Sequence, residues 1–181
     1  MRRPPVPSPE RADSPLVRFY RGDAPDARGR TLDDILAWDN EQLEAVHDYI
    51  QWLFPLDEPS RFNRDAPLLT GADRQAFRQP TVAGNLRRSL DRMLAFYGFA
   101  LDRSAANPRI ARSAQWKERS PEWLHAGNHN LLRLTRMIRS LALLGEVDLA
   151  TALYAALRQE CEGRVSSVTI EYWKEATDAD S

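Results

Sequence analysis

The chain has 181 residues, which is the size of one domain with its own hydrophobic core. Hydrophobic residues make up 43% of it and charged residues 28%, as in ordinary soluble globular proteins. The formal net charge is -1, which excludes an overall electrostatic attraction to nucleic acid or to acidic membranes. Only Lys117 and Lys174 are lysines, and we interpret most of the arginines as compositional bias.

Four features concern the compartment, the membrane and the chain ends. Cys161 is the only cysteine, so the chain cannot form an internal disulfide, and it fits a reducing compartment. No run of about 18 apolar residues occurs, so we expect no membrane-spanning helix. Because the first residues lack the apolar core of a secretory signal, we expect a cytoplasmic protein. The prolines within residues 1–15 predict a disordered tail.

Apolar residues at helical spacing, with polar caps and helix-ending prolines and glycines, predict helices along most of the remaining chain. In chain order, helices are predicted over 31–38, 41–54, a short segment after Thr70, a long segment from Pro80 to Gly98, a segment opening at Ser120-Pro121, 128–144, a segment capped by Asp148, and 168–176. Segments 55–69 and 100–119 are predicted as loops. No pair of alternating β-branched runs around a hairpin turn appears.

These elements predict an all-α fold, a single-domain multi-helix bundle built from residues 16–176, with a frayed tail over 177–181. The helix over 41–54 is apolar on nearly every side, so we expect it at the centre of the bundle. Thr31 is the predicted N-cap of the helix over 31–38, and Thr70 is that of the short helix that follows Thr70. Gly98 is predicted to end the long helix that begins at Pro80.

The run from His47 to Pro55 is the most distinctive stretch, because it places a histidine and an amide among many aromatic and aliphatic residues. On the helix over 41–54, His47 falls at the edge of the apolar surface, beside Glu44 and Gln51. Two interpretations stay open. The histidine either packs at a border and bonds to a neighbouring group, or it contacts a ligand.

A polar stripe, His129, Arg133, Arg136 and Ser140, follows one side of the helix over 128–144. It is either a solvated face or a site for an anion or carboxylate, which arginine binds in a bidentate way. Asn130 lies beside the apolar residues and should need a buried hydrogen-bond partner.

Other constellations give little support for catalysis or metal binding. His125 and His129 have the spacing of metal ligands on a helix, but the glutamate of a zincin is missing and Gly127 lies between them. Cys161 has no nearby histidine and is interpreted as a small buried residue. The sequence has neither a Gly-rich phosphate loop nor a G-x-S-x-G motif. We therefore expect no metal, no cofactor and no catalytic residue.

The chain resembles the conserved region of the opioid growth factor receptor family over most of residues 16–175. The resemblance rests on Phe19-Tyr20-Arg21-Gly22, His47-x-Tyr49-Ile50-Gln51-Trp52-Leu53-Phe54-Pro55, Leu94-x-Phe96-Tyr97-Gly98, Trp116-x-Glu118-Arg119, His129-Asn130-x-Leu132-Arg133-x-Thr135-Arg136, Ser140-Leu141 and Glu171-Tyr172. It implies receptor activity, since animal members are described as receptors for an enkephalin peptide that restrain cell growth, at the nucleus or at membranes. With the conserved region alone, the chain is similar to short microbial members. The resemblance implies no catalytic residues.

From these patterns we predict a non-enzymatic binding or receptor-like domain for an anionic small molecule or peptide. Nucleic acid is not an expected partner. The predicted ligand-binding residues come from the two most distinctive blocks and from one further tryptophan: His47, Gln51, Trp52, Trp116, His129, Asn130, Arg133 and Arg136. In this hypothesis the two arginines hold the anion, and the two tryptophans form the apolar wall.

Two alternatives remain at this point. The chain is an enzyme if His47 or His129 acts as acid or base while Arg133 and Arg136 bind an anionic substrate; a cavity with a carboxylate partner for one histidine would favour this. It is a structural or interaction module if the same polar residues connect helices internally.

Overall fold

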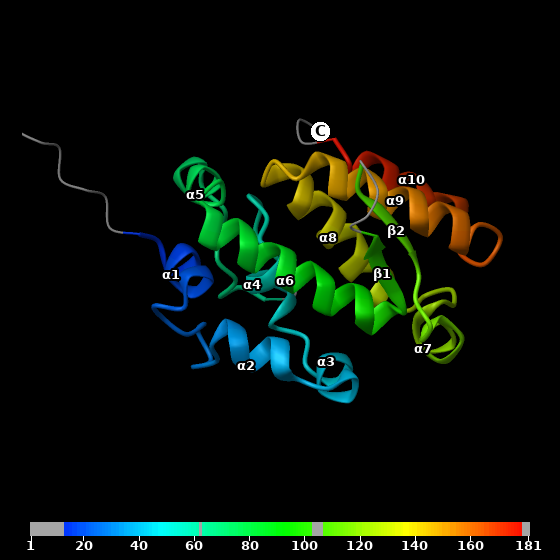
Figure 1. The fold of residues 1–181 in the computed structure, drawn as a ribbon, viewed down its shortest axis with the longest axis horizontal. Coiled ribbons are helices and arrows are strands. Elements are labelled where there is room, and N and C mark those ends of the chain that lie inside the picture. Colours follow the sequence, from blue (N-terminus) through cyan, green and yellow to red (C-terminus); the bar gives the residue numbers. More distant parts are fainter. Residues whose placement is uncertain (1–12, 62, 103–106, 179–181) are drawn as a thin grey trace, which may run out of the picture.

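The computed structural model describes residues 13–61, 63–102 and 107–178 of the chain. Within them lie helices and one short strand pair: α1 (Pro15–Arg21), α2 (Leu32–Ala37), α3 (Asn40–Ala45), α4 (Ile50–Leu53), α5 (Gly71–Ala76), α6 (Pro80–Tyr97), β1 (Phe99–Asp102), β2 (Arg109–Arg112), α7 (Trp116–Trp123), α8 (Asn130–Leu143), α9 (Val147–Cys161) and α10 (Ser167–Glu175). Helix α6 runs through the middle, with α1 to α3 on one side and α8 to α10 on the other (Figure 1).

One continuous hydrophobic cluster joins the described elements from α1 to α10. Its largest fully buried side chains include Trp123, Trp173 and Tyr97, and Trp123 and Trp173 each donate an indole hydrogen bond to a backbone carbonyl. The mostly helical, single-domain fold predicted from the sequence is thereby confirmed.

Several helix ends are set by local sequence, as predicted. Thr31 and Asp34 form a capping box at the start of α2, and Thr70 and Asp73 form one at the start of α5. Gly98 ends α6 in the left-handed conformation, with φ 84°. There a Cβ would lie 2.9 Å from the Cα of Trp116, so the glycine also allows α7 to approach.

The strand pair contradicts the prediction of a plain loop over 100–119. Strands β1 and β2 pair antiparallel, from Phe99 opposite Arg112 to Asp102 opposite Arg109. They are too short to show a clear alternation in sequence, and tertiary contacts stabilise them: β2 lies against α9, and Arg112 Nε donates to Glu160 Oε2 at 2.5 Å.

The predicted central helix over 41–54 is wrong, because the chain leaves the helical conformation between α3 and α4. Val46 is extended, with φ -93° and ψ 135°. The carbonyls of Leu43 and Val46 receive hydrogen bonds from Arg133 of α8, far along the chain, instead of from the next helical turn. The break also turns Gln51, predicted on the polar side, into the interior, where it is 4% exposed.

Other helix starts differ from the prediction by a few residues. Helix α7 begins at Trp116 and contains Pro121, which was predicted to open it; Trp116 and Trp123 pack against each other and against Phe99, and this packing decides the start. Helix α9 begins at Val147 after Glu146, so Asp148 is not its cap. The predicted helix over 128–144 spans Asn130–Leu143.

The predicted tails are only partly described. Ser14 caps α1, which begins at Pro15, inside the predicted tail. Residues 1–12 and 179–181 lie outside the described residues. Of the helices that are described, none combines the length and the apolar composition needed to cross a membrane.

Candidate functional site

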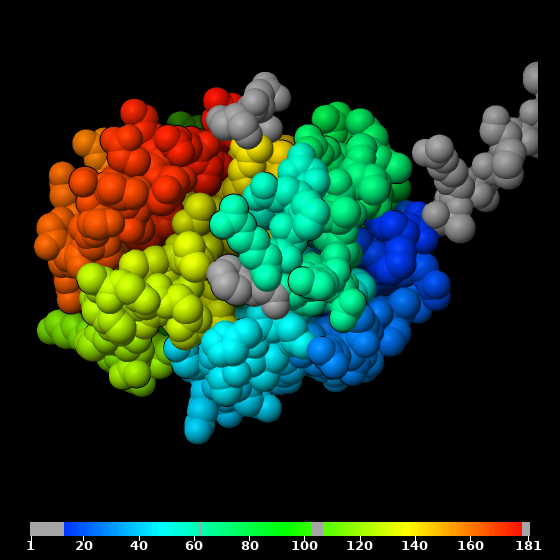
Figure 2. All heavy atoms as spheres, turned by 180° about the vertical axis from the view of Figure 1, so that it is seen from behind, coloured from blue at the N-terminus to red at the C-terminus, as the bar shows by residue number. Residues whose placement is uncertain are grey.

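The polar stripe of α8 faces the segment 43–55 rather than solvent. Arg133 is 5% exposed, and Ser140 is fully buried. In the space-filling view α8 appears as a yellow strip between the turquoise segment that follows α4 and the orange-red α10 (Figure 2). The interpretation of the stripe as a solvated face is therefore wrong for Arg133, Arg136 and Ser140. Of the four residues, only His129 is exposed.

Arg133 holds the break between α3 and α4. Its Nη1 donates to the Leu43 carbonyl at 2.9 Å and its Nη2 donates to the Val46 carbonyl at 2.8 Å. Nη2 also lies 2.9 Å from His47 Nδ1, and the guanidinium stacks 5.5 Å from the centroid of the Tyr49 ring. A planar fork with several donors suits this task, because the carbonyls at a helix end lack partners within the helix.

Asn130 has the buried partners that the sequence predicted. Its Oδ1 accepts from the Tyr97 hydroxyl at 3.3 Å and from Arg133 Nη1 at 3.2 Å, and its Nδ2 donates to Glu44 Oε2 at 3.0 Å. The side chain is fully buried. Asn130 therefore connects α8 to α6 and α3 inside the protein.

Arg136 and Ser140 continue the same contact along α8. Ser140 Oγ donates to the Pro55 carbonyl at 2.8 Å. Arg136 Nη1 donates to the Phe54 carbonyl at 3.2 Å, and no carboxylate of the described residues lies within ion-pairing distance of its guanidinium. Burial lowers the pKa of Arg136, while the more distant Glu58 acts in the opposite sense.

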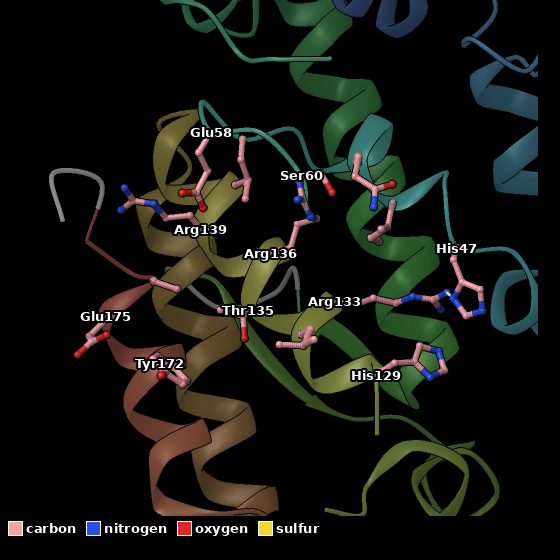
Figure 3. Close-up of a pocket in the computed structure, with 15 residues that line it drawn as sticks. His47, Glu58, Ser60, His129, Arg133, Thr135, Arg136, Arg139, Tyr172 and Glu175 are labelled. Atoms are coloured by element: carbon pink, nitrogen blue, oxygen red, sulfur yellow. Dashed lines mark hydrogen bonds between the residues drawn. The ribbon is translucent and has the colours of Figure 1, made fainter. Parts of the chain in front are cut away.

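His47 and His129 lie together beside Arg133, with their ring centroids 5.0 Å apart (Figure 3). His129 Nε2 lies 3.3 Å from Glu44 Oε1. Partial burial and the neighbouring Arg133 lower the pKa of His129, whereas Glu44 raises it. The described residues contain no cluster of three side chains able to hold a metal ion.

A cavity of about 600 Å³ opens between α4, the segment 56–60, α8 and α10. Polar and charged side chains gather on it, and Figure 3 shows Arg133 extending toward His47 while Arg136 extends toward the segment that carries Ser60. The lining residues are His47, Ile50, Gln51, Leu56, Glu58, Ser60, His129, Leu132, Arg133, Thr135, Arg136, Arg139, Tyr172, Glu175 and Ala176.

The structure brings together five of the eight residues predicted as a site. His47, Gln51, His129, Arg133 and Arg136 all line the cavity. Gln51 Oε1 is buried without a hydrogen-bond partner among the described residues.

The remaining three predicted residues lie elsewhere. Asn130 lies beneath the cavity as an internal connection. Trp52 packs edge-on against Phe19, and Trp116 packs against Phe99 in a separate part of the core. Neither tryptophan is among the lining residues, so the apolar wall predicted from them comes instead from Ile50, Leu56 and Leu132.

Sequence reasoning missed the rim of the cavity. Leu132 and Tyr172 line it and are unusually exposed for large apolar side chains, at 61% and 58%. Glu58 and Glu175 add two carboxylates. Tyr172 belongs to a recognised block, but nothing in the sequence places α10 beside α8.

Comparison with known proteins gives a consistent result. The family model for the opioid growth factor receptor (OGFr) conserved region matches residues 10–176. The chain is 34% identical over 169 residues to opioid growth factor receptor-like protein 1 of Mus musculus, a match that covers 87% of this chain and 35% of the relative. It is 38% identical over 139 residues to the opioid growth factor receptor of Homo sapiens, which covers 74% of this chain and 20% of the relative.

The chain therefore spans about a third or less of the length of these relatives. No solved structure matches it significantly. The matched region includes every element described above, from α1 to α10, and the cavity with all the residues that line it. On the extent of the family match and the identity to both relatives, the chain belongs to the family defined by the opioid growth factor receptor conserved region.

Proposed function

We propose that the chain is a non-enzymatic binding domain whose ligand occupies the cavity between α4, α8 and α10. The observation that carries the proposal is the guanidinium of Arg136, which lines a largely apolar cavity and has no ion-pair partner among the described residues. A desolvated cation in a concave site favours an anionic ligand, and the cavity volume suits a compound of drug size.

Gln51 supports the same proposal. Its amide lines the cavity, yet Oε1 lacks a partner among the described residues. Because Oε1 is an acceptor, an anion cannot satisfy it directly, but the amide loses no hydrogen bond of Oε1 to the described residues when it turns. Because the last torsion of a glutamine is soft, a small rotation would turn its amide toward a ligand.

The names of the relatives agree with a binding role, since both are called receptors or receptor-like. Within the predicted site, the proposal assigns ligand contact to His47, Gln51, His129 and Arg136, and assigns to Arg133 an internal role first. The cytoplasmic location and the microbial origin inferred from the sequence stay predictions.

A thermal-shift screen tests the proposal. Small acids, nucleotides and short peptides are compared on the native chain, on Arg136→Gln and on Arg87→Gln, whose arginine pairs with Glu146 and is not among the lining residues. A ligand of the cavity raises the melting temperature of the native chain and of Arg87→Gln by mass action, and loses its effect on Arg136→Gln. Equal shifts in all three proteins would reject the site.

A second function is favoured by one observation, the carboxylate partner of His129. The contact between His129 and Glu44 at the end of the cavity is the arrangement that orients an acid–base histidine. If the protein is an enzyme, a compound found in the screen should be converted, and Glu44→Gln should lower its turnover more than its binding. Unchanged compound after prolonged incubation would reject this alternative.

A further inference from the structure

We infer that the ligand of this cavity is an apolar monocarboxylic acid that enters with its carboxylate inward, toward Arg136, and leaves its apolar body between Leu132 and Tyr172. This inference rests on the proposed function and goes beyond it by naming the ligand's chemical class and its orientation.

The net charge of the residues that line the cavity indicates how many negative charges the ligand carries. Arg133, Arg136 and Arg139 face Glu58 and Glu175, which leaves one positive charge in excess at neutral pH. Such a site neutralises one carboxylate, whereas a nucleotide or phosphate monoester would bring a second, unpaired negative charge into a partly desolvated cavity.

Of the three arginines among the described residues that line the cavity, we assign the direct contact to Arg136. Arg133 is occupied by the Leu43 and Val46 carbonyls and by Asn130. Arg139 donates to the carbonyl of Asp178 and takes part in a further interaction as well. Arg136 makes a single hydrogen bond, to the Phe54 carbonyl, and keeps further donors of its fork for a bidentate carboxylate.

The distribution of apolar side chains sets the orientation. Ile50 and Gln51 are buried at the inner wall, and Arg136 is half-buried. Leu132 on α8 and Tyr172 on α10 stand at the opening, more than half exposed. Exposed apolar side chains at the mouth of a cavity are the surface that a ligand's hydrocarbon part would cover, so the charged group lies inward.

The carboxylate would also meet the amide of Gln51. That amide lines the cavity together with Arg136, and its Oε1 is without a partner among the described residues. Turned about its last bond, the amide presents its N–H₂ donors to a carboxylate oxygen and leaves the guanidinium to bind the other. An aliphatic alcohol or amide would give the arginine no charge to pair with.

The test uses calorimetric titration with butanoate, hexanoate, octanoate and decanoate, each compared with its primary amide and with the alkyl phosphate of the same length. Affinity of the native chain for the acids should increase about fourfold per added methylene until the apolar surface is covered. The amides should bind roughly 10- to 100-fold more weakly, because the charge-assisted hydrogen bonds are lost. The alkyl phosphates should bind more weakly than the acids.

Two variants test separately the binding of the ligand's carboxylate and the binding of its hydrocarbon part. Arg136→Gln should remove the preference for acid over amide, while the control Arg87→Gln keeps it. Leu132→Ser changes an exposed residue, so the fold should tolerate it, and it should lower the affinity for decanoate while leaving butanoate unaffected. If Leu132→Ser weakens every acid equally or none, the orientation is wrong.

Tighter binding of alkyl phosphates than of acids, or no binding of any acid, would overturn the inference. If nucleotides or peptides then still bind in an Arg136-dependent way, the proposed function survives with another ligand. If no compound of any class depends on Arg136, the inference and the proposed function fail together.

Discussion

Replacing Arg133 by methionine removes the donors that satisfy the carbonyls at the end of α3 but keeps a side chain of similar length. The Leu43 and Val46 carbonyls each lose a bond of less than 3 Å, and Asn130 Oδ1 loses one of its two donors. A buried acceptor left without a partner costs about 1–3 kcal/mol. The Leu43 carbonyl keeps its hydrogen bond from the Tyr49 hydroxyl at 3.1 Å, so only the partly buried Val46 carbonyl is left without a partner. With the weakened bonding at Leu43 and Asn130 added, we expect a loss of roughly 2–4 kcal/mol of unfolding free energy.

Such a loss is a large part of the ~5–15 kcal/mol that stabilises a typical domain. In a domain of this size it corresponds to a fall in melting temperature of roughly 4–16 °C. The assay is urea unfolding followed by tryptophan fluorescence, with the midpoint and slope both fitted. A reduced slope would show that segment 43–50 is already loosened in the folded state.

Arg136→Met is the matched control, because Arg136 lies on the same face of α8, one turn later, and makes one hydrogen bond to a carbonyl. We expect a loss of about 1 kcal/mol, the lower end of the range for an acceptor without a partner, because the bond to the Phe54 carbonyl is only partly buried and methionine adds apolar surface to the cavity wall. Equal losses for both variants would refute the assignment of Arg133 to internal support and of Arg136 to ligand contact.

Two further predictions concern the close packing of α6 on α7 and the histidine pair. Gly98→Ala should cost more than Gly22→Ala in urea unfolding, by about 1–3 kcal/mol: both glycines have positive φ, but only at Gly98 would the added Cβ meet backbone, 2.9 Å from Trp116 Cα. Equal costs would show that α7 shifts freely. The second prediction follows from the pKa of His129, which burial and Arg133 hold below its ordinary value. The unfolded chain then binds the proton more readily, so the unfolding free energy should fall as pH decreases from above about 6.5 through the folded-state pKa. His129→Gln should flatten this dependence between pH 5 and 8, whereas His125→Gln, away from the pair, should not.

What the sequence predicted correctly depends on contacts between near neighbours. The capping boxes at Thr31 and Thr70 and the stop at Gly98 each involve residues within a few positions, and each forms as predicted. The single helical domain follows from periodicity summed over many residues. Local rules failed where distant residues decide: β2 is stabilised from α9, and α7 starts where two tryptophans pack.

The candidate site was only partly predictable for the same reason. The blocks that carry His47 and Gln51 and the block that carries Arg133 and Arg136 could be identified as polar groups in unusual places. That they face each other across a cavity could not be derived from the sequence, because nothing in it places α10 and the segment 56–60 beside α8. The tryptophans misled the prediction, because aromatic residues near polar ones are more often core than wall, as Trp52 and Trp116 are here.

The two central arginines show what decides between an internal and an external role. Arg133 and Arg136 are one helical turn apart on α8, and no property of the sequence distinguishes them. Arg133 lies opposite the point where α3 ends, so the carbonyls of Leu43 and Val46 occupy its donors. Arg136 lies opposite the end of α4, where it reaches only the Phe54 carbonyl, and the adjacent Pro55 carbonyl is satisfied by Ser140. Its unused donors are the consequence of that pairing, and the proposed binding of an anionic ligand rests on them.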